Sequence, residues 1–194
     1  MNFKPTPLPG AVLVETQPHE DDRGWFARVY CEREFAAHGL PARMVQGNLS
    51  LTQRTGTLRG MHWQAPPHEE DKLVRCVHGS IWDVIVDIRP ASATCCQWFG
   101  VELSESNGRM LLVPKGFAHG FVTLTDAAAV SYLMSEFYAP AAARGARHDD
   151  PAFGIEWPVQ VKEMSDKDRC WPDFNREAGA AAPDSKILRE GINA

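Results

Sequence analysis

Short apolar runs, separated by glycine, proline and charged residues, make up most of the middle of the chain. Residues 73–77 are apolar at four of their five positions, and residues 80–88 are rich in isoleucine and valine. Further apolar runs cover 110–113, 121–124 and 129–133. Apolar runs of this length, bounded by turn residues, are typical of β-strands. The pattern therefore predicts a series of short strands.

Turn residues lie between these runs, and helical patterns are rare. Turn residues separate neighbouring predicted strands at three places: the His-Gly dipeptide at 78–79, the Pro-Lys-Gly sequence at 114–116, and Asp126. A short helix is predicted over 32–38, because a glycine and then a proline follow it, which are the usual stop signals. Many short strands with only one or two helices are typical of a sandwich or a jelly roll.

The length of the chain favours one domain. A chain of 194 residues can bury a substantial core, and no internal repeat or low-complexity stretch divides its first 175 residues. We therefore expect a single domain over 1–175. Residues 178–184 are small residues and proline followed by one aspartate. This composition predicts a mobile or loosely packed C-terminal tail over 176–194.

The charge of the chain argues against nucleic-acid binding. The formal net charge is −5 with no dense run of lysine and arginine, whereas binding to a phosphate backbone rests on clustered positive charge. No apolar run approaches the roughly 20 residues of a membrane span. The N-terminal residues lack the charged-then-apolar order of a signal peptide. We expect a cytoplasmic protein that binds neither nucleic acid nor membrane.

The cysteines do not form a recognisable framework. The chain has five, with one adjacent pair and no CxxC spacing. An odd number in this arrangement argues against both a set of disulfides and a zinc site. We expect reduced thiols, most of them buried.

The polar residues that could carry chemistry gather in two segments. Residues 59–64 read Arg-Gly-Met-His-Trp-Gln and are followed by Lys72, and residues 114–120 form a turn that leads into His119. Taken alone, a histidine in a β-barrel is more often structural than functional. The acidic run at 69–71 is interpreted as a solvated loop.

Strand alternation assigns sides to the first segment. In a regular strand Arg59 and Met61 face one side, and Gly60 and His62 face the other. A bulge, which is common at barrel rims, would change this assignment.

The histidines do not have the spacing of a metal site. Barrels that bind iron, zinc or manganese take two or three histidines and a carboxylate, often with two histidines one residue apart. Here Gln64 stands two residues after His62, His119 has no nearby second histidine, and His68 falls in a proline-rich loop. We predict that the protein uses no metal.

Seven stretches in a fixed order carry a family resemblance. They are residues 21–26, 46–50, 56–64, 71–75, 83–89, 114–121, and 150–151 together with 155–158. In these stretches, which span roughly residues 5 to 170, the chain resembles the dTDP-4-dehydrorhamnose 3,5-epimerase family. The resemblance implies a mainly β fold, a cupin jelly-roll β-barrel with a few short helices, that works as a homodimer without metal or organic cofactor.

The family's reaction has three chemical requirements. A base removes the proton beside a ketone, an acid returns a proton to the opposite face, and a cationic or hydrogen-bonding group stabilises the enolate between the two steps. By resemblance, His62 is the base and Asp168 is its carboxylate partner. Lys72 faces the C4 oxygen of the sugar, and Tyr132 supplies the proton from the opposite face.

The resemblance also implies which residues bind the nucleotide sugar. Two arginines contact the diphosphate, two amides and a histidine hold polar groups, one aromatic residue packs on the base, and a further aromatic residue lines the pocket. In that order they are Arg23 and Arg59, Gln46, Asn48 and His119, and Phe26 and Tyr138.

The leading hypothesis is inversion of C3 and C5 in a nucleotide-linked 4-keto-6-deoxy sugar, which converts dTDP-4-dehydro-6-deoxy-D-glucose to dTDP-4-dehydro-L-rhamnose. Three alternatives remain open at this point. The first is a monofunctional 3- or 5-epimerase acting on another nucleotide sugar in deoxysugar biosynthesis. The second is a metal-dependent cupin enzyme, such as an oxygenase or an isomerase. The third is a non-catalytic module that binds sugar nucleotides.

Overall fold

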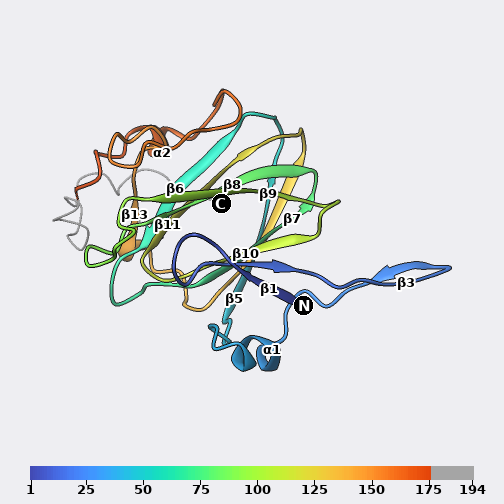
Figure 1. Ribbon diagram of the computed structural model, residues 1–194. Helices are drawn as coiled ribbons and strands as arrows, with labels where there is room; N and C mark the ends of the chain where they lie inside the picture. Colours follow the sequence, from blue (N-terminus) through green and yellow to red (C-terminus); the bar gives the residue numbers. More distant parts are fainter. Residues whose placement is uncertain (176–194) are drawn as a thin grey trace.

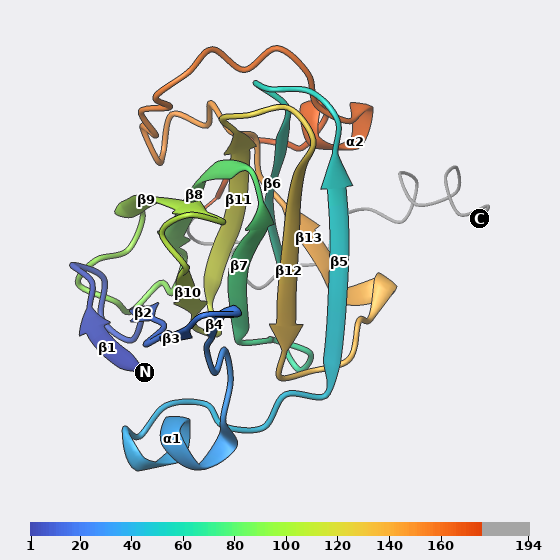
Figure 2. The same ribbon diagram turned by 90° about the vertical axis from the view of Figure 1, so that its right-hand side faces the viewer.

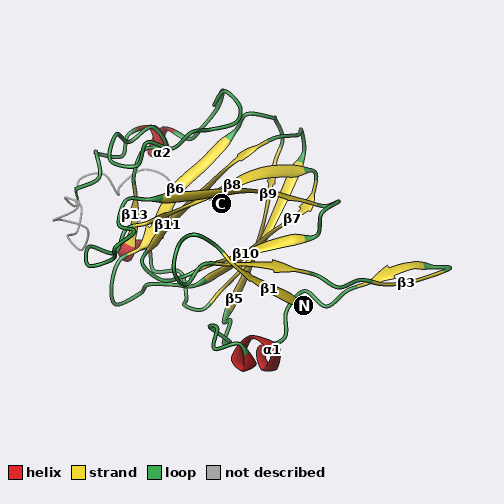
Figure 3. Ribbon diagram, in the orientation of Figure 1, coloured by secondary structure: helices red, strands yellow, loops and turns green. Residues whose placement is uncertain are grey.

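The computed structural model describes residues 1–175 of the chain. The predicted tail at 176–194, with its small-residue stretch at 178–184, lies outside the described residues. Strands dominate the part that is described, and helices are few and short (Figure 3).

Two antiparallel sheets face each other and form the body of the molecule (Figures 1 and 2). The six-stranded sheet has the order β1 (Asn2–Pro5), β2 (Val12–Glu15), β10 (Arg109–Val113), β7 (Lys72–His78), β12 (Ala128–Met134) and β5 (Gln46–Thr52). The five-stranded sheet has the order β13 (Ala143–Gly145), β6 (Leu58–Gln64), β11 (Phe117–Thr123), β8 (Ser80–Asp87) and β9 (Trp98–Ser104). This arrangement is the jelly roll expected from the sequence.

Smaller elements surround the two sheets. A hairpin of β3 (His19–Asp21) and β4 (Gly24–Phe26) extends away from the barrel (Figure 1). Helix α1 (Glu32–Ala37) follows it, a 3-10 turn covers Pro140–Ala142, and α2 (Asp166–Arg169) lies near the start of β6. No helix in this described portion is both long and apolar enough to cross a membrane.

The sequence pattern located five of these strands and one helix. The runs at 73–77, 80–88, 110–113 and 129–133 correspond to β7, β8, β10 and β12, and the predicted helix at 32–38 corresponds to α1. The run at 121–124 is only the end of β11, which begins four residues earlier. Strands β5 and β9 were not predicted, because each mixes polar and apolar residues.

Apolar side chains fill one part of the space between the sheets. Val74 and Cys76 of β7 and Val130 of β12 meet Ile85 of β8 and Leu103 of β9, and all five are buried. Burial of such side chains contributes about 1.5–3 kcal/mol each to folding. The remaining space, toward β5 and β6, is hollow and contains the candidate site.

Strand β6 contains a bulge that changes which of its side chains face the interior. His62 pairs with His119 of β11, whereas Arg59 pairs with Phe121, so three residue steps on β6 lie opposite two on β11. The extra residue places Arg59 and His62 on the same cavity and puts Met61 in a separate apolar cluster. The expectation that Arg59 and Met61 face one side is therefore wrong, because regular alternation ends at a bulge.

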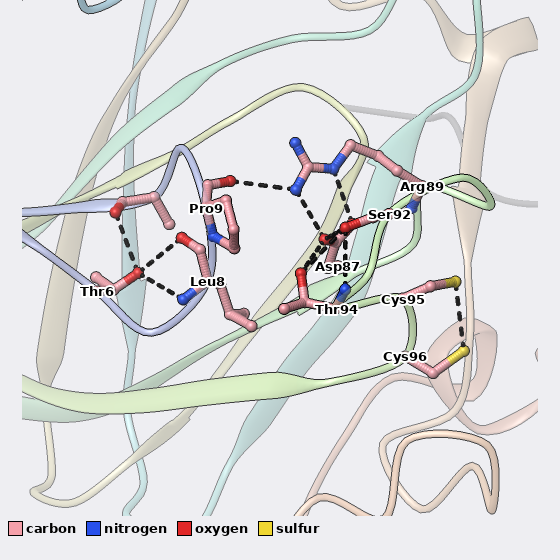
Figure 4. A network of polar contacts seen from close by, with 10 residues as sticks. Thr6, Leu8, Pro9, Asp87, Arg89, Ser92, Thr94, Cys95 and Cys96 are labelled. Atoms are coloured by element: carbon pink, nitrogen blue, oxygen red, sulfur yellow. Dashed lines mark hydrogen bonds and ion pairs between the residues drawn. The ribbon is translucent and has the colours of Figure 1, made fainter.

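The cysteines differ from expectation in their burial. Cys76 is buried, but Cys31, Cys95 and Cys96 are only partly buried and Cys170 is exposed. The prediction that most are buried is wrong, because four of the five lie in loops next to strands and helices rather than on an inward strand face. The thiols of Cys95 and Cys96 are 3.8 Å apart (Figure 4), well beyond the about 2.05 Å of a disulfide bond.

The buried carboxylate of Asp87 links the N-terminal segment to the barrel through Arg89. Asp87, at the end of β8, accepts hydrogen bonds from the Arg89 guanidinium at 2.7 and 2.8 Å and from the hydroxyls of Ser92 and Thr94 at 2.6 Å (Figure 4). Arg89 also donates to the carbonyl of Pro9 at 3.1 Å. Burial alone raises the pKa of Asp87, but these hydrogen bonds outweigh burial and hold the pKa at about 2.

Candidate active site

A cavity of about 740 Å³ opens between the two sheets. Nine of the eleven residues predicted for the site line it: His62, Lys72, Tyr132 and Asp168, and also Gln46, Asn48, Arg59, His119 and Tyr138. These residues come from segments that are far apart in the chain, so the fold is what brings them together.

His62 and Asp168 form a hydrogen-bonded pair at the wall formed by β6. Nε2 of His62 is 2.5 Å from Oδ1 of Asp168, which lies on α2 and is 4% exposed. Ser165 caps α2 by accepting a hydrogen bond from the backbone N–H of Asp168 at 3.1 Å. The backbone N–H of Gly60 also points at the carboxylate, at 3.5 Å.

The charge state of Asp168 follows from these partners. Burial raises its pKa, but the hydrogen bond and positive charge from His62, with smaller contributions from Gly60 and Ser165, hold the pKa below its usual range. Asp168 is therefore an acceptor for the imidazole N–H at neutral pH. This arrangement fixes the tautomer of His62.

Lys72 points into the cavity from the start of β7. Its Nζ lies 3.0 Å from Oε1 of Glu70 and 3.5 Å from the carbonyl oxygen of His62. Glu70 and Asp71 are each 7% exposed. The interpretation of residues 69–71 as a solvated loop is therefore wrong for two of its three residues.

The reason for this burial is a set of hydrogen bonds around Asp71. Its carboxylate accepts from the hydroxyl of Ser135 at 3.0 Å and from the backbone N–H of Lys115 at 3.1 Å. The sequence alone contained one indication that Glu70 lies beside Lys72 in the site. In an extended chain, residues 70 and 72 lie on the same side, so the side that carries Lys72 also carries Glu70.

Tyr132 lies on the opposite wall from His62, because β12 belongs to the six-stranded sheet and β6 to the five-stranded sheet. Its ring packs against the apolar core. Burial raises the pKa of Tyr132 above its usual value of 10, and the effect of Glu70 adds to this while the charge of Arg59 opposes it. The phenol is therefore neutral near pH 7 and can donate a proton.

His119 forms a second histidine–carboxylate pair. Its Nε2 is 2.8 Å from Oδ1 of Asp83, which has no exposed surface. The other carboxylate oxygen of Asp83 is buried without a hydrogen-bond partner among the described residues. His119 of β11 lies directly opposite His62 in the strand register.

Polar groups form the cavity wall next to β5. Gln46 donates to Asn48 at 3.3 Å and accepts the backbone N–H of Tyr138 at 3.1 Å. Arg59 is held by Thr52, whose hydroxyl accepts from Nε at 2.9 Å. The exposed guanidinium and the half-exposed ring of Tyr138 suit an anionic, aromatic ligand such as a nucleotide.

Two predicted residues lie outside the cavity of their own chain. Arg23 and Phe26 are on the projecting β3–β4 hairpin, where the Arg23 side chain is 88% exposed and Phe26 is 73% exposed. Arg23 forms an ion pair with Asp21 within the hairpin. Any contact of these two residues with a ligand must therefore involve a different cavity or a different position of the hairpin.

Among the described residues, acidic, sulfur and imidazole side chains are not clustered in the manner of a metal site. Within residues 1–175, no group of three or more His, Cys, Asp or Glu side chains is placed to hold a metal ion. The two histidine–carboxylate pairs remain separate pairs.

Comparison with known proteins gives concordant matches. Residues 5–176 match the family model for dTDP-4-dehydrorhamnose 3,5-epimerase. The chain is 42% identical over 172 residues to the dTDP-4-dehydrorhamnose 3,5-epimerase of Methanothermobacter thermautotrophicus, a match that covers 87% of this chain and 92% of that protein.

Solved structures match at the level of the whole fold. A dTDP-4-dehydrorhamnose 3,5-epimerase from Bacillus anthracis with TDP and PPi bound superposes with a TM-score of 0.86 at 40% identity, over 89% of this chain and 99% of that chain. A 3′-monoepimerase from Streptomyces bikiniensis in complex with dTDP-quinovose superposes with a TM-score of 0.82 at 31% identity, over 88% and 86% of the two chains.

Proposed function

The chain belongs to the dTDP-4-dehydrorhamnose 3,5-epimerase family and is an epimerase of that kind, and from this premise we propose how its residues carry out the reaction. The substrate is dTDP-4-dehydro-6-deoxy-D-glucose, and inversion at C3 and C5 gives dTDP-4-dehydro-L-rhamnose. One observation carries the mechanism: the His62–Asp168 pair and Tyr132 line one cavity from opposite sheets.

His62 removes the proton from the carbon beside the ketone. Because the Asp168 carboxylate accepts the Nε2–H at 2.5 Å, Nδ1 is the nitrogen with a free lone pair. The proton moves to Nδ1, and the buried carboxylate stabilises the imidazolium that results. General base catalysis of this type contributes about 10²–10⁴-fold.

Lys72 stabilises the charge that develops on the C4 oxygen. When the C–H bond breaks, its electron pair moves into the enolate and the negative charge falls on that oxygen. An ammonium group in a largely desolvated site opposes this charge strongly. Lys72 is 9% exposed and needs little reorganisation to stabilise the charge on the C4 oxygen.

Tyr132 completes each inversion from the other wall. Its neutral phenol donates a proton to the carbon on the face away from His62, and the enolate collapses to the ketone. Each inversion leaves His62 protonated and Tyr132 ionised, so exchange with solvent restores both groups before the second carbon reacts. The same pair of side chains therefore serves C3 and C5.

The diphosphate and the base bind along the polar wall. Arg59 presents a planar guanidinium to the phosphate oxygens, as arginine does for bidentate anions. Gln46, Asn48 and His119 hold polar groups of the sugar nucleotide, and Tyr138 packs on the base.

The test is deuterium exchange. Purified protein is incubated with dTDP-4-dehydro-6-deoxy-D-glucose in heavy water, and incorporation is followed by NMR. We expect deuterium at C3 and C5, and loss of both signals in His62→Asn. Incorporation at one carbon identifies a monofunctional epimerase, which the likeness to a 3′-monoepimerase makes a specific alternative. Binding of dTDP with no exchange at either carbon identifies a binding module.

We also propose that the active form is a homodimer. Leu49 and Leu51 of β5 are 71% and 53% exposed, on the outer side of the six-stranded sheet. Trp25 and Phe26 of the hairpin are 63% and 73% exposed. Two apolar surfaces of this kind on one chain are typical of an interface with another protein, and a second copy supplies both surfaces.

A dimer gives the hairpin residues a place to act. Because Arg23 and Phe26 lie outside the cavity of their own chain, we propose that they bind substrate in the cavity of the other copy. Their cation and aromatic ring match a diphosphate and a base.

Mixed dimers test this exchange. Phe26→Ala and His62→Asn protomers are refolded together. If Phe26 acts on the other copy, each mixed dimer has one site with native His62 and native Phe26, and activity recovers. If it acts within its own chain, no site has both and activity stays low. Light scattering of the wild type checks the dimer. Leu49→Asp should give a monomer, whereas the control Val159→Asp, at another exposed apolar residue, should leave the dimer intact.

A further inference from the structure

Glu70 has no part in the mechanism above, yet it contacts the lysine on which that mechanism depends. Its Oε1 is 3.0 Å from Nζ of Lys72, and the two side chains are 3% and 11% exposed. Glu70 also lines the cavity that holds His62 and Tyr132. We propose that Glu70 is a positioning residue that holds the Lys72 ammonium toward the C4 oxygen of the bound sugar. This inference rests on the proposed function.

Stability does not account for a carboxylate at this position. Burying an ion pair removes both charges from water, and the attraction between them often fails to offset that loss. The second oxygen of Glu70, Oε2, is buried without a hydrogen-bond partner in the described structure. A buried polar atom without a hydrogen-bond partner lowers the stability of the fold, because it has lost its bonds to water. The benefit of Glu70 therefore lies in the site.

The hydrogen bonds of Lys72 show what Glu70 does. An ammonium group has three N–H donors. One is directed at Oε1 of Glu70 and one at the carbonyl oxygen of His62, at 3.5 Å. Two fixed acceptors set the direction of the third donor, which is left for the substrate. Without Glu70, the long lysine side chain regains rotamer freedom.

The backbone around Glu70 is fixed well enough for this role. The N–H of Asp71 donates to the hydroxyl of Ser135 at 2.8 Å, and the carbonyl of Asp71 accepts from the N–H of Ser135 at 3.0 Å. These bonds tie the residue between Glu70 and Lys72 to the end of β12. Glu70 is consequently held in place and does not need the ion pair to order it.

Glu70→Gln is the first test, because it removes the charge and keeps the shape. We expect kcat to fall about 10- to 100-fold, since small displacements of a catalytic group have effects of this size. KM and the dissociation constant for dTDP are expected to stay within about twofold, because ground-state binding does not use Lys72 strongly. Glu69→Gln, at the neighbouring and less buried residue, is the matched control and keeps wild-type kcat.

A double-mutant cycle separates positioning from a general structural effect. Lys72→Met removes the group on which Glu70 acts, so Glu70→Gln should cause no further loss of residual exchange in that background. Glu70→Asp keeps the carboxylate and should recover part of kcat. If Glu70→Gln does not fold, the same cycle is run with Glu70→Asp. We then expect a few-fold loss of activity in the protein with Lys72 and no further loss in the Lys72→Met background.

The outcomes distinguish this inference from the proposed function. A wild-type protein that exchanges no deuterium overturns the proposed function itself. A wild-type protein that exchanges deuterium, together with a Glu70→Gln variant of unchanged kcat, overturns only the role of Glu70. A loss that is equal in the Lys72 and Lys72→Met backgrounds, or that appears in KM alone, also overturns it.

Discussion

His62 and His119 lie directly opposite each other on neighbouring strands, and each has its own buried carboxylate partner. The partners come from different places: Asp168 from α2, late in the chain, and Asp83 from β8 within the same sheet as His119. Two imidazoles, each paired with a buried carboxylate, thus face one cavity, and we propose that one acts as the base and the other as a binding group.

Replacing the two carboxylates should separate these roles. Asp168→Asn removes the acceptor that selects the reactive tautomer of His62, so kcat should fall by about 10²-fold or more. Asp83→Asn should raise KM and lower kcat less than about tenfold, because His119 binds substrate without moving a proton. Steady-state kinetics of both variants check this. Equal losses of kcat would contradict the division of roles.

Tyr132→Phe should uncouple proton removal from inversion. The variant keeps His62 and Lys72, so proton removal and return by the same histidine continue, while the opposite-face donor is lost. We expect deuterium exchange without formation of the epimer, measured by NMR on one sample. Full inversion by the variant would assign the donor to another group or to water.

The raised pKa of Tyr132 makes a separate prediction about pH. Because burial moves the pKa above 10, the phenol stays protonated through neutral and mildly alkaline conditions, and it loses its proton only above that value. Burial raises the pKa of Tyr30 as well, so ultraviolet titration should show more than one tyrosine that ionises above pH 10, and one of these transitions should be missing in Tyr132→Phe. A transition below pH 10 that disappears in the variant would contradict the burial argument.

Asp87→Asn should destabilise the fold. The native carboxyl has a pKa of about 2, below its ordinary value of 3.8, and a difference of this size corresponds to about 2 kcal/mol. Because the pKa is lowered in the folded state, this stability is present above pH 4 and is lost as the pH falls toward 2. Urea unfolding of both proteins at pH 7 and pH 3 should show the difference shrinking at the lower pH. A difference that is independent of pH would locate the effect in packing.

Gly60→Ala should displace the catalytic strand. Gly60 has φ +135°, and an added Cβ would lie 2.5 Å from the Cα of Gly120 on β11. The two strands must separate to accept it, at a cost of about 1–3 kcal/mol. The N–H that Gly60 directs at Asp168 moves as well. We expect lower thermal stability together with reduced kcat, and an unchanged melting temperature would contradict the close approach.

Local pattern in the sequence was sufficient for the strands with continuous apolar runs and for the order of the motifs. Apolar runs predicted β7, β8, β10 and β12 because each buries a continuous set of side chains, which is a property of neighbouring residues. The ordered motifs identified His62 and Lys72 by type and position. The family comparison confirms the family to which these motifs belong.

Only the tertiary structure decided how these residues meet. The Asp168 carboxylate reaches His62 across 106 positions of sequence, and no local pattern encodes that contact. The bulge in β6 places Arg59 on the same side as His62, because one extra residue in a strand moves the side chains beyond it to the opposite face. The sequence predicted that Glu70 is solvated, but it is buried, because burial depends on which parts of the chain pack over a residue. The hairpin with Phe26 lies outside its own cavity, because the path of a chain in space is set by long-range contacts and not by the order of its motifs.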